Sequence, residues 1–274
     1  MAQATAPQKK KSKKFPMGIV VIVVAFIVSE LIFHLVFGDV KHFIDETKKE
    51  PKPGDYFGII YKGGFIVPFL MTMAITVLAF GVERFITIRK ARGKGSLEEF
   101  LQKIKHYLAT GNIKAAKEEC NKQQGSVANV VLAGLNKYEE MQQNTELEEE
   151  KKILAISKEI EEATALELPS LEENLPILAT IASVATLVAL LGTVLGMIRA
   201  FAALATSGTP DPTALASGIS EALINTAIGI ATSAFAIIFY NIFTSMIDKL
   251  TYGIDEIGFS IAQSFATSSK LVKQ

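Results

Sequence analysis

The chain has 274 residues, a formal net charge of zero, 49% hydrophobic residues and one cysteine, Cys120. A single cysteine excludes an internal disulfide, and no paired aromatic and basic patches point to nucleic-acid binding. The average hydrophobicity would also fit a soluble core, so the lengths of the apolar runs decide the class of protein.

Four apolar runs are long enough to cross a membrane. A spanning helix needs roughly 20 apolar residues, because the hydrocarbon core is about 30 Å thick and the backbone must satisfy its own hydrogen bonds there. The runs cover residues 15–37, 63–88, 175–204 and 213–247. We therefore predict an all-α membrane protein with four transmembrane helices.

The first run follows five lysines between Lys9 and Lys14, and only Glu30 and His34 interrupt its later part. A basic start before an apolar stretch also occurs in secretory signals, but this run is long and no small-x-small cleavage site follows it. We therefore expect an uncleaved membrane anchor.

Basic flanks orient the predicted helices, because Lys and Arg concentrate on the cytoplasmic side of a membrane. The basic residues that close the second run are Arg84, Arg89, Lys90, Arg92 and Lys94. Residues 205–213, between the third and fourth runs, carry no basic residue. We predict that both termini and residues 88–174 are cytoplasmic, whereas residues 38–62 and 207–212 face outward.

The segment between the second and third runs predicts a small bundle of cytoplasmic helices. Apolar residues recur at three- and four-residue steps from Leu97 to Leu108, which indicates an amphipathic helix. Residues 110–112 end this helix, a second helix covers residues 113–122, and a third opens at Gln124.

From Thr145 onward the chain is acidic and helix-forming, and it leads into the third run. We interpret its apolar stripe as the packed face of a solvated helix, in preference to a catalytic pair of carboxylates. Pro169 and Pro176 predict a bend or a short interruption near the membrane surface. The predicted division of the chain is a basic N-terminus, extra anchor and outer loop (1–62), a second span (63–88), cytoplasmic helices (89–174), paired spans (175–247) and a cytoplasmic C-terminal helix (248–274).

Glu221 and Arg199 stand out in the paired spans, because an ionisable side chain inside a membrane is expected to face a cavity or a polar partner. Most other polar residues there are small hydroxyls, which can bond to a carbonyl one turn back. A structural salt bridge or a snorkelling arginine is the alternative to a functional role for the charged residues.

Thr193 and Thr226 lie almost equally far along the chain from Thr209, the centre of the turn between the paired spans. In an antiparallel hairpin they would sit at nearly equal depth, with Glu221 about 7 to 8 Å nearer the outside at ~1.5 Å per residue. Copies related by cyclic symmetry would repeat this polar tier as rings. The residues themselves leave open whether the tier is a pore or a polar interface.

No residue pattern indicates covalent chemistry. The three histidines have no ligand partner at helical spacing, and no nucleotide fingerprint or Ser/His/Asp set occurs. We therefore expect neither an enzyme nor a bound metal or organic cofactor.

The paired spans carry a recognisable pattern. The stretch LATIASVATLVALLGTVLGMIRAF (178–201), followed by GISEALINTAIGIATSAFAIIFYN (218–241), resembles the paired signature of the MotA/TolQ/ExbB proton-channel family. Residues 108–135 look like the helical region of the same family, and the chain is most similar to its ExbB branch.

This resemblance implies a bacterial inner-membrane pentamer around a central pore. The lumen would hold an ExbD-like single-span subunit with an intramembrane aspartate, proton flow past that aspartate would drive motion, and a TonB-like protein would receive it. By motif position, Thr193 and Thr226 match the pore-lining threonines of the family, and Glu221 matches its membrane glutamate. Secondary candidates for the pore or the interface are Thr186, Asn225 and Arg199.

The chain departs from the family at several positions. Val184 and Ala189 stand where threonine and glycine are common, and Phe235 replaces the usual proline of the fourth span. We therefore expect different helix bends and a changed pore lining. The first anchor is additional to the three spans of the simplest members, and we expect it to pack outside the ring, against lipid or an accessory protein.

Other functions are compatible with the same residues. A TolQ-like motor for envelope maintenance has the same pattern, whereas a flagellar stator has a differently arranged cytoplasmic part. A self-sufficient ion channel would conduct without a partner helix. In a membrane scaffold that does not conduct, Glu221 would only fix the register of the helices.

Overall fold

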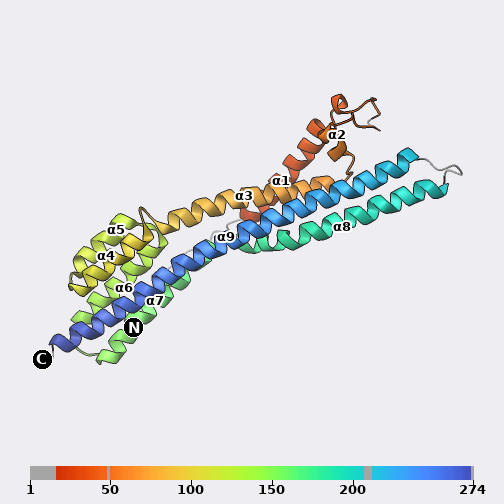
Figure 1. Cartoon of the computed structure of the whole chain (residues 1–274). Coiled ribbons are helices and arrows are strands. Elements are labelled where there is room, and N and C mark those ends of the chain that lie inside the picture. The colour runs from red at the N-terminus through yellow and green to blue at the C-terminus, as the bar shows by residue number, and fades with distance from the viewer. Residues whose placement is uncertain (1–16, 48–49, 207–211, 273–274) are drawn as a thin grey trace, which may run out of the picture. The chain divides into compact units, whose positions relative to one another are not determined.

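The computed structural model describes residues 17–47, 50–206 and 212–272, and these form helices joined by turns, with one isolated β-bridge between Phe43 and Pro51 (Figure 1). The prediction of an all-α protein is confirmed for this part of the chain. The N-terminal lysines and the turn around Thr209 lie outside the described residues.

The helical elements in chain order are α1 (Met17–Leu31), the π-helix η1 (Ile32–Phe37), the 3-10 helix η2 (Val40–His42), α2 (Tyr56–Tyr61), α3 (Ile66–Arg92), α4 (Leu97–Ala109), α5 (Ile113–Gln123), α6 (Gly125–Gln143), α7 (Glu149–Glu172), α8 (Leu175–Thr206) and α9 (Pro212–Val272). Four helical stretches are long and apolar enough to cross a membrane, as predicted. They lie within residues 18–37, 66–109, 149–202 and 215–268.

Several helix bounds differ from the predicted ones, and two of the differences have a clear cause. The helix α3 begins at Ile66, three residues after the predicted start, because Gly64 has a φ of +75° and turns the chain before the helix. The helix α9 runs without a break through residues 247–248, where the sequence analysis separates the paired spans from a C-terminal helix.

The chain folds into two compact units. The first unit combines Met1–Ala79 with Val184–Ser233, and the second combines Phe80–Ser183 with Ala234–Gln274. The first unit therefore contains α1, the short helices that follow it, the start of α3 and the facing parts of α8 and α9. The second unit contains α4 to α7 with the remaining parts of α3, α8 and α9.

Aromatic contacts hold the connection between α1 and α3 in the first unit. The rings of Phe33 and Tyr61 stack with centroids 4.7 Å apart, and those of Phe37 and Phe57 stack at 5.4 Å. Asp55 begins α2 as its N-cap, and its carboxylate accepts the backbone N–H groups of the first turn.

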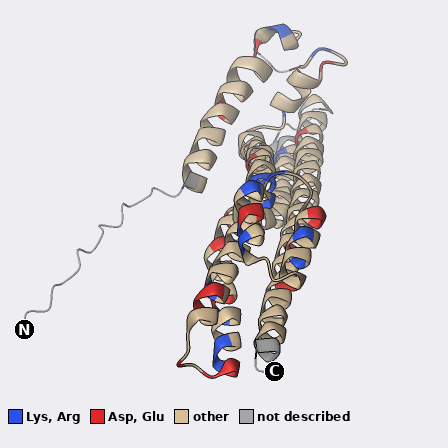
Figure 2. Cartoon of the chain, turned by 90° about the vertical axis from the view of Figure 1, so that its left-hand side faces the viewer, with Lys and Arg blue, Asp and Glu red and all other residues tan. Residues whose placement is uncertain are grey.

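The second unit is a helical bundle whose helices agree with the predicted ones. Ser96 and Asn112 cap α4 and α5, which explains where these helices begin. Buried residues of α6, α7 and α9 form the centre of the bundle, and Tyr138 meets Phe265 edge to face with ring centroids 5.0 Å apart. Figure 2 shows acidic and basic residues gathered on this bundle, whereas α1 is almost entirely uncharged.

The interruption predicted near Pro169 and Pro176 is confirmed, since Glu173 and Asn174 form a turn between α7 and α8. Pro169 lies inside α7 and does not end it, and Pro176 lies in the first turn of α8, where a missing N–H is tolerated.

Candidate functional site

Small residues bring α8 and α9 together in the first unit. A Cβ added to Gly229 would lie 2.2 Å from the Cβ of Ala189, and one added to Gly196 would lie 2.9 Å from the carbonyl oxygen of Gly218. Real Cβ atoms do not approach other atoms this closely, so a larger residue at either position would push the helices apart. Small residues allow such close packing between membrane helices. This seam fixes the register of α8 against α9.

That register places Thr193 of α8 beside Thr226 of α9, with the two Oγ1 atoms 2.5 Å apart. Each hydroxyl also lies within hydrogen-bonding distance of a carbonyl in its own helix, at 3.1 Å from Ala189 for Thr193 and 3.0 Å from Ala222 for Thr226. A hydroxyl has one proton and two lone pairs, so one threonine donates to the other while the second donates to its own helix. The two threonines therefore lie side by side, as their equal spacing from the turn predicts.

Glu221 forms an ion pair with Arg199. The glutamate is buried, with 8% of its surface exposed, whereas half of the arginine side chain is exposed and its guanidinium lies 5.6 Å from the ring centre of Phe65. A Cβ on Gly64 would lie 2.5 Å from the carboxylate oxygen of Glu221. The carboxylate thus packs against the turn before α3 of its own chain, and the salt bridge considered in the sequence analysis is formed.

Asn225 is fully buried and connects α9 to the turn before α3. Its Nδ2 donates to the carbonyl of Gly63 at 3.0 Å, and its Oδ1 has no hydrogen-bond partner among the described residues. The glycine at position 192 leaves room for it, since a Cβ there would lie 2.8 Å from the asparagine side chain. Asn225 therefore has a packing role, and one acceptor remains available.

Thr186 is not brought into this set, because its side chain is exposed on α8, two turns from Thr193. Conversely, Gly63, Gly64 and Phe65 contact the polar residues of α8 and α9, although they were not among the predicted site residues. A Gly-Gly pair directly before an apolar run is a turn signal, and it could have drawn attention to this segment.

Arg84 in the second unit has a role that its flanking position did not suggest. It is only 1% exposed, it pairs with the carboxylate of Glu83, and it donates to the carbonyls of Ser170 and Leu171 at 3.0 and 3.1 Å. The last carbonyls of a helix have no partner within it, so this arginine satisfies the end of α7.

The hairpin offers hydroxyl and carboxyl groups, which can hydrogen-bond and exchange protons. Across the described ranges, no group of three or more His, Cys, Asp or Glu side chains could hold a metal ion.

Comparison with known proteins supports the resemblance drawn from the sequence. Residues 122–256 match the model of the MotA/TolQ/ExbB proton channel family, and this range includes Thr193, Glu221 and Thr226.

Curated relatives carry the names TolQ and ExbB. The Tol-Pal system protein TolQ of Pseudomonas aeruginosa is 33% identical over 124 residues, which are 45% of this chain and 54% of that protein. The biopolymer transport protein ExbB of Pseudomonas putida is 29% identical over 185 residues, covering 67% of this chain and 52% of the relative. ExbB of Salmonella typhimurium is 41% identical over 78 residues, or 28% of this chain and 32% of the relative.

The aligned regions thus span about half, or less, of the length of these relatives. The names of the relatives and the family match over the paired spans agree with each other. Residues 122–256, which contain most of the two paired helices, are therefore similar to the MotA/TolQ/ExbB proton channel family.

Proposed function

We propose that this chain is the channel-forming stator subunit of an inner-membrane motor driven by the proton-motive force. Like the relatives that are named biopolymer transport protein ExbB, it would take part in biopolymer transport. Its partners would be an ExbD-like single-span subunit and a TonB-like protein. The observation that carries the proposal is the contact between Thr193 and Thr226, which lies in paired apolar helices inside the family match.

The chemistry of the hydroxyl pair supports proton transfer past a partner helix. Hydrocarbon surroundings offer no polar groups, so hydroxyls at this depth would be the ones that a partner's carboxyl meets. Each hydroxyl can both donate and accept, and it can therefore hold either protonation state of that carboxyl or a bridging water. Cyclic symmetry would repeat the pair around a central axis. The resemblance to the MotA/TolQ/ExbB family implies that the ring is a pentamer.

Glu221 supports assembly in this proposal. Its carboxylate is buried, paired with Arg199 and packed against Gly64, so it would hold the hairpin against the start of α3. Removing one partner of such a pair leaves an uncompensated charge, which is costly in a membrane.

The proposed orientation places both termini and the bundle of the second unit in the cytoplasm. Its support is the group of basic residues Arg89, Lys90 and Arg92 in the last turn of α3.

A TolQ-like role in envelope maintenance is the second candidate, and the similarity to TolQ of Pseudomonas aeruginosa favours it. The two roles separate by complementation. The chain would restore energised uptake in a strain lacking its own ExbB protein if the first role holds, and detergent resistance in a strain lacking TolQ if the second holds.

The test of the proposal is the native mass of the detergent-extracted complex, expressed with and without a neighbouring single-span protein that carries an intramembrane aspartate. We expect a homo-oligomer that takes up a smaller number of partner chains, and that conducts protons in liposomes only with the partner present. A homo-oligomer that never takes up the partner would contradict the proposal and favour an independent channel or a scaffold.

A further inference from the structure

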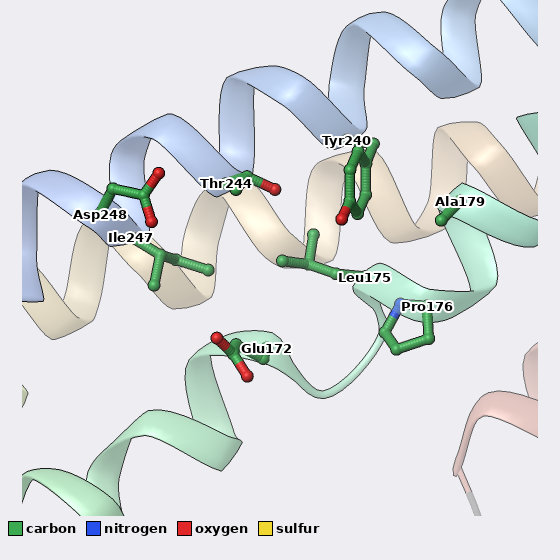
Figure 3. Close-up of a pocket in the computed structure, with 8 residues that line it drawn as sticks. All are labelled: Glu172, Leu175, Pro176, Ala179, Tyr240, Thr244, Ile247 and Asp248. Atoms are coloured by element: carbon green, nitrogen blue, oxygen red, sulfur yellow. The ribbon is translucent and has the colours of Figure 1, made fainter.

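Two pockets in the second unit lie beside the same turn of α9, at the end of the fourth predicted span. One is acidic, with a volume of about 430 Å³, and lies between the end of α7, the start of α8 and α9 (Figure 3). The other is basic, with a volume of about 410 Å³, and lies between α3, α4 and α9.

The acidic pocket has unused polar groups. Glu172 and Asp248 line it, and neither carboxylate has an ion-pair partner among the described residues. Tyr240 and Thr244 contribute hydroxyls from α9, and the Thr244 Oγ1 is buried with no hydrogen-bond partner in the described part of the chain. Both carboxylates are exposed, so they are accessible to a positively charged partner, and the buried Thr244 hydroxyl adds one hydrogen-bonding group.

The basic pocket has the opposite charge. Arg89, Arg92 and Lys249 line it together with one acidic residue, Glu98. The Glu98 Oε2 atom lies 3.9 Å from Nη2 of Arg92. Arg89 and Lys249 have no ion-pair partner within the described ranges. Phe85 and other apolar side chains form its walls.

The two pockets open on different sides of α9. Asp248 and Lys249 are consecutive, and consecutive residues of an α-helix point about 100° apart at ~3.6 residues per turn. Beyond them on α9, Tyr252 and Phe259 are each 71% exposed. Tyr252 and Phe259 are seven residues apart, so they lie on one face of α9, where a second chain could cover them.

We propose that the basic pocket of one copy faces the acidic pocket of the next copy, so that Arg89 and Lys249 pair with Glu172 and Asp248 across the contact. A twofold contact would need both pockets on one face, so that each meets the other pocket of the second copy. Because the two pockets open on different sides of α9, they match head to tail, and a head-to-tail contact that closes forms a ring. This inference rests on the proposed function and adds to it the surfaces that join the copies.

A second copy fits these pockets better than a lipid does. Glu172 and Asp248 would repel anionic lipid headgroups. The basic pocket of a neighbouring chain, in contrast, presents cationic side chains together with apolar ones. Such charge pairs fix the register of an interface and exclude wrong pairings more than they add affinity. The expected signature is therefore a dependence of assembly on the sign of the charges.

The test reverses charges on the full chain. The double variant Glu172→Lys, Asp248→Lys would make both facing pockets basic. The double variant Arg89→Glu, Lys249→Glu would make both facing pockets acidic. We expect each pair of substitutions to remove most of the oligomer from the native mass distribution in detergent. The fourfold variant reverses both sides together, and we expect its oligomer to return, which also shows that the reversed residues are compatible with folding.

The matched control is Lys114→Glu with Glu118→Lys, at two exposed residues of α5 that line neither pocket. It should leave the native mass of the oligomer unchanged. Persistence of the wild-type oligomer in both charge-reversed pairs would overturn the inference, and so would failure of the fourfold variant to restore it. The wild-type chain tests the proposed function separately, because its own oligomer and its partner-dependent proton flux are measured without any substitution.

Discussion

The hydroxyl of Thr226 can be removed with almost no change of shape, because valine is nearly isosteric with threonine. We expect Thr226→Val to fold and insert, since one hydrogen bond contributes about 0.5–1.5 kcal/mol net, and to lose partner-dependent proton flux in liposomes. Thr226→Ser keeps the hydroxyl and should keep the flux. The control is Thr180→Val, because among the described residues the Thr180 hydroxyl donates to the carbonyl of Pro176 in its own helix and to no other group. Normal flux in Thr226→Val would remove this residue from the mechanism.

Asp55 makes the loop before α3 sensitive to acid. The hydrogen bond with His42, at 2.7 Å, lowers the pKa of Asp55 below its usual 3.8. A carboxyl with a lowered pKa stabilises the folded loop above its unfolded pKa, and this contribution is lost as the pH falls through the folded value. We expect the protection factors of amides in residues 50–61, which are corrected for the intrinsic pH dependence of exchange, to fall as the pH drops below about 4. Asp55→Asn retains a capping side chain but no charge, and this acid-dependent fall in protection should disappear.

Cys120 should be inert in the folded chain. Burial raises the pKa of its thiol to about 12, and only the thiolate is a good nucleophile. We expect no reaction with a maleimide at neutral pH until the chain is denatured. Lys122→Cys places a thiol at an exposed site of the same helix and is the matched control that labels at once. Rapid native labelling of Cys120 would show that α5 opens readily.

At the scale of elements, the seam between α8 and α9 depends on residues without side-chain bulk. Gly229→Ala would bring a Cβ within 2.2 Å of Ala189, and overpacking of this kind costs typically about 1–3 kcal/mol. We expect a lower thermal midpoint in detergent and a weaker contact between Thr193 and Thr226. Ala231→Val, on the exposed face of the same helix, adds bulk without a clash and should leave the midpoint near that of the wild type.

Helices were predictable at this scale because the forces that define them are local. Ser96 and Asn112 cap α4 and α5 from adjacent positions, and the amphipathic spacing after Leu97 buries one face of α4. The end of the fourth span was not predictable in the same way. Polar residues such as Asp248 enter there, but the hydrogen bonds of α9 continue past them, so a change of surroundings does not end the helix.

At the scale of the whole molecule, the first of the four long apolar stretches, residues 18–37, is the least buried. Only 17% of the residues in its most apolar window are buried, and the family match begins far beyond it, at residue 122. We expect a chain that lacks residues 1–37 to keep the native mass of the oligomer and to lose at most part of the energised transport. The control is the same chain with a different uncleaved anchor in front. Complete loss of assembly would place α1 inside the ring.

The sequence alone predicts the all-α fold, four helices long and apolar enough to cross a membrane, the bundle helices and the adjacency of Thr193 and Thr226. Each of these follows from run length, local periodicity or equal spacing about a turn, and none requires knowledge of distant neighbours. The resemblance of the paired spans to one family rests on the same local motifs.

The tertiary structure decided which polar groups meet. Glu221 forms an ion pair with Arg199 and packs against Gly64. Asn225 donates a hydrogen bond to the carbonyl of Gly63, which is 162 positions away in the chain. Arg84 ends α7 through carbonyls more than 80 residues distant. Partners so far apart leave no periodic trace in a sequence, because packing of whole helices, and not spacing along the chain, brings their side chains together.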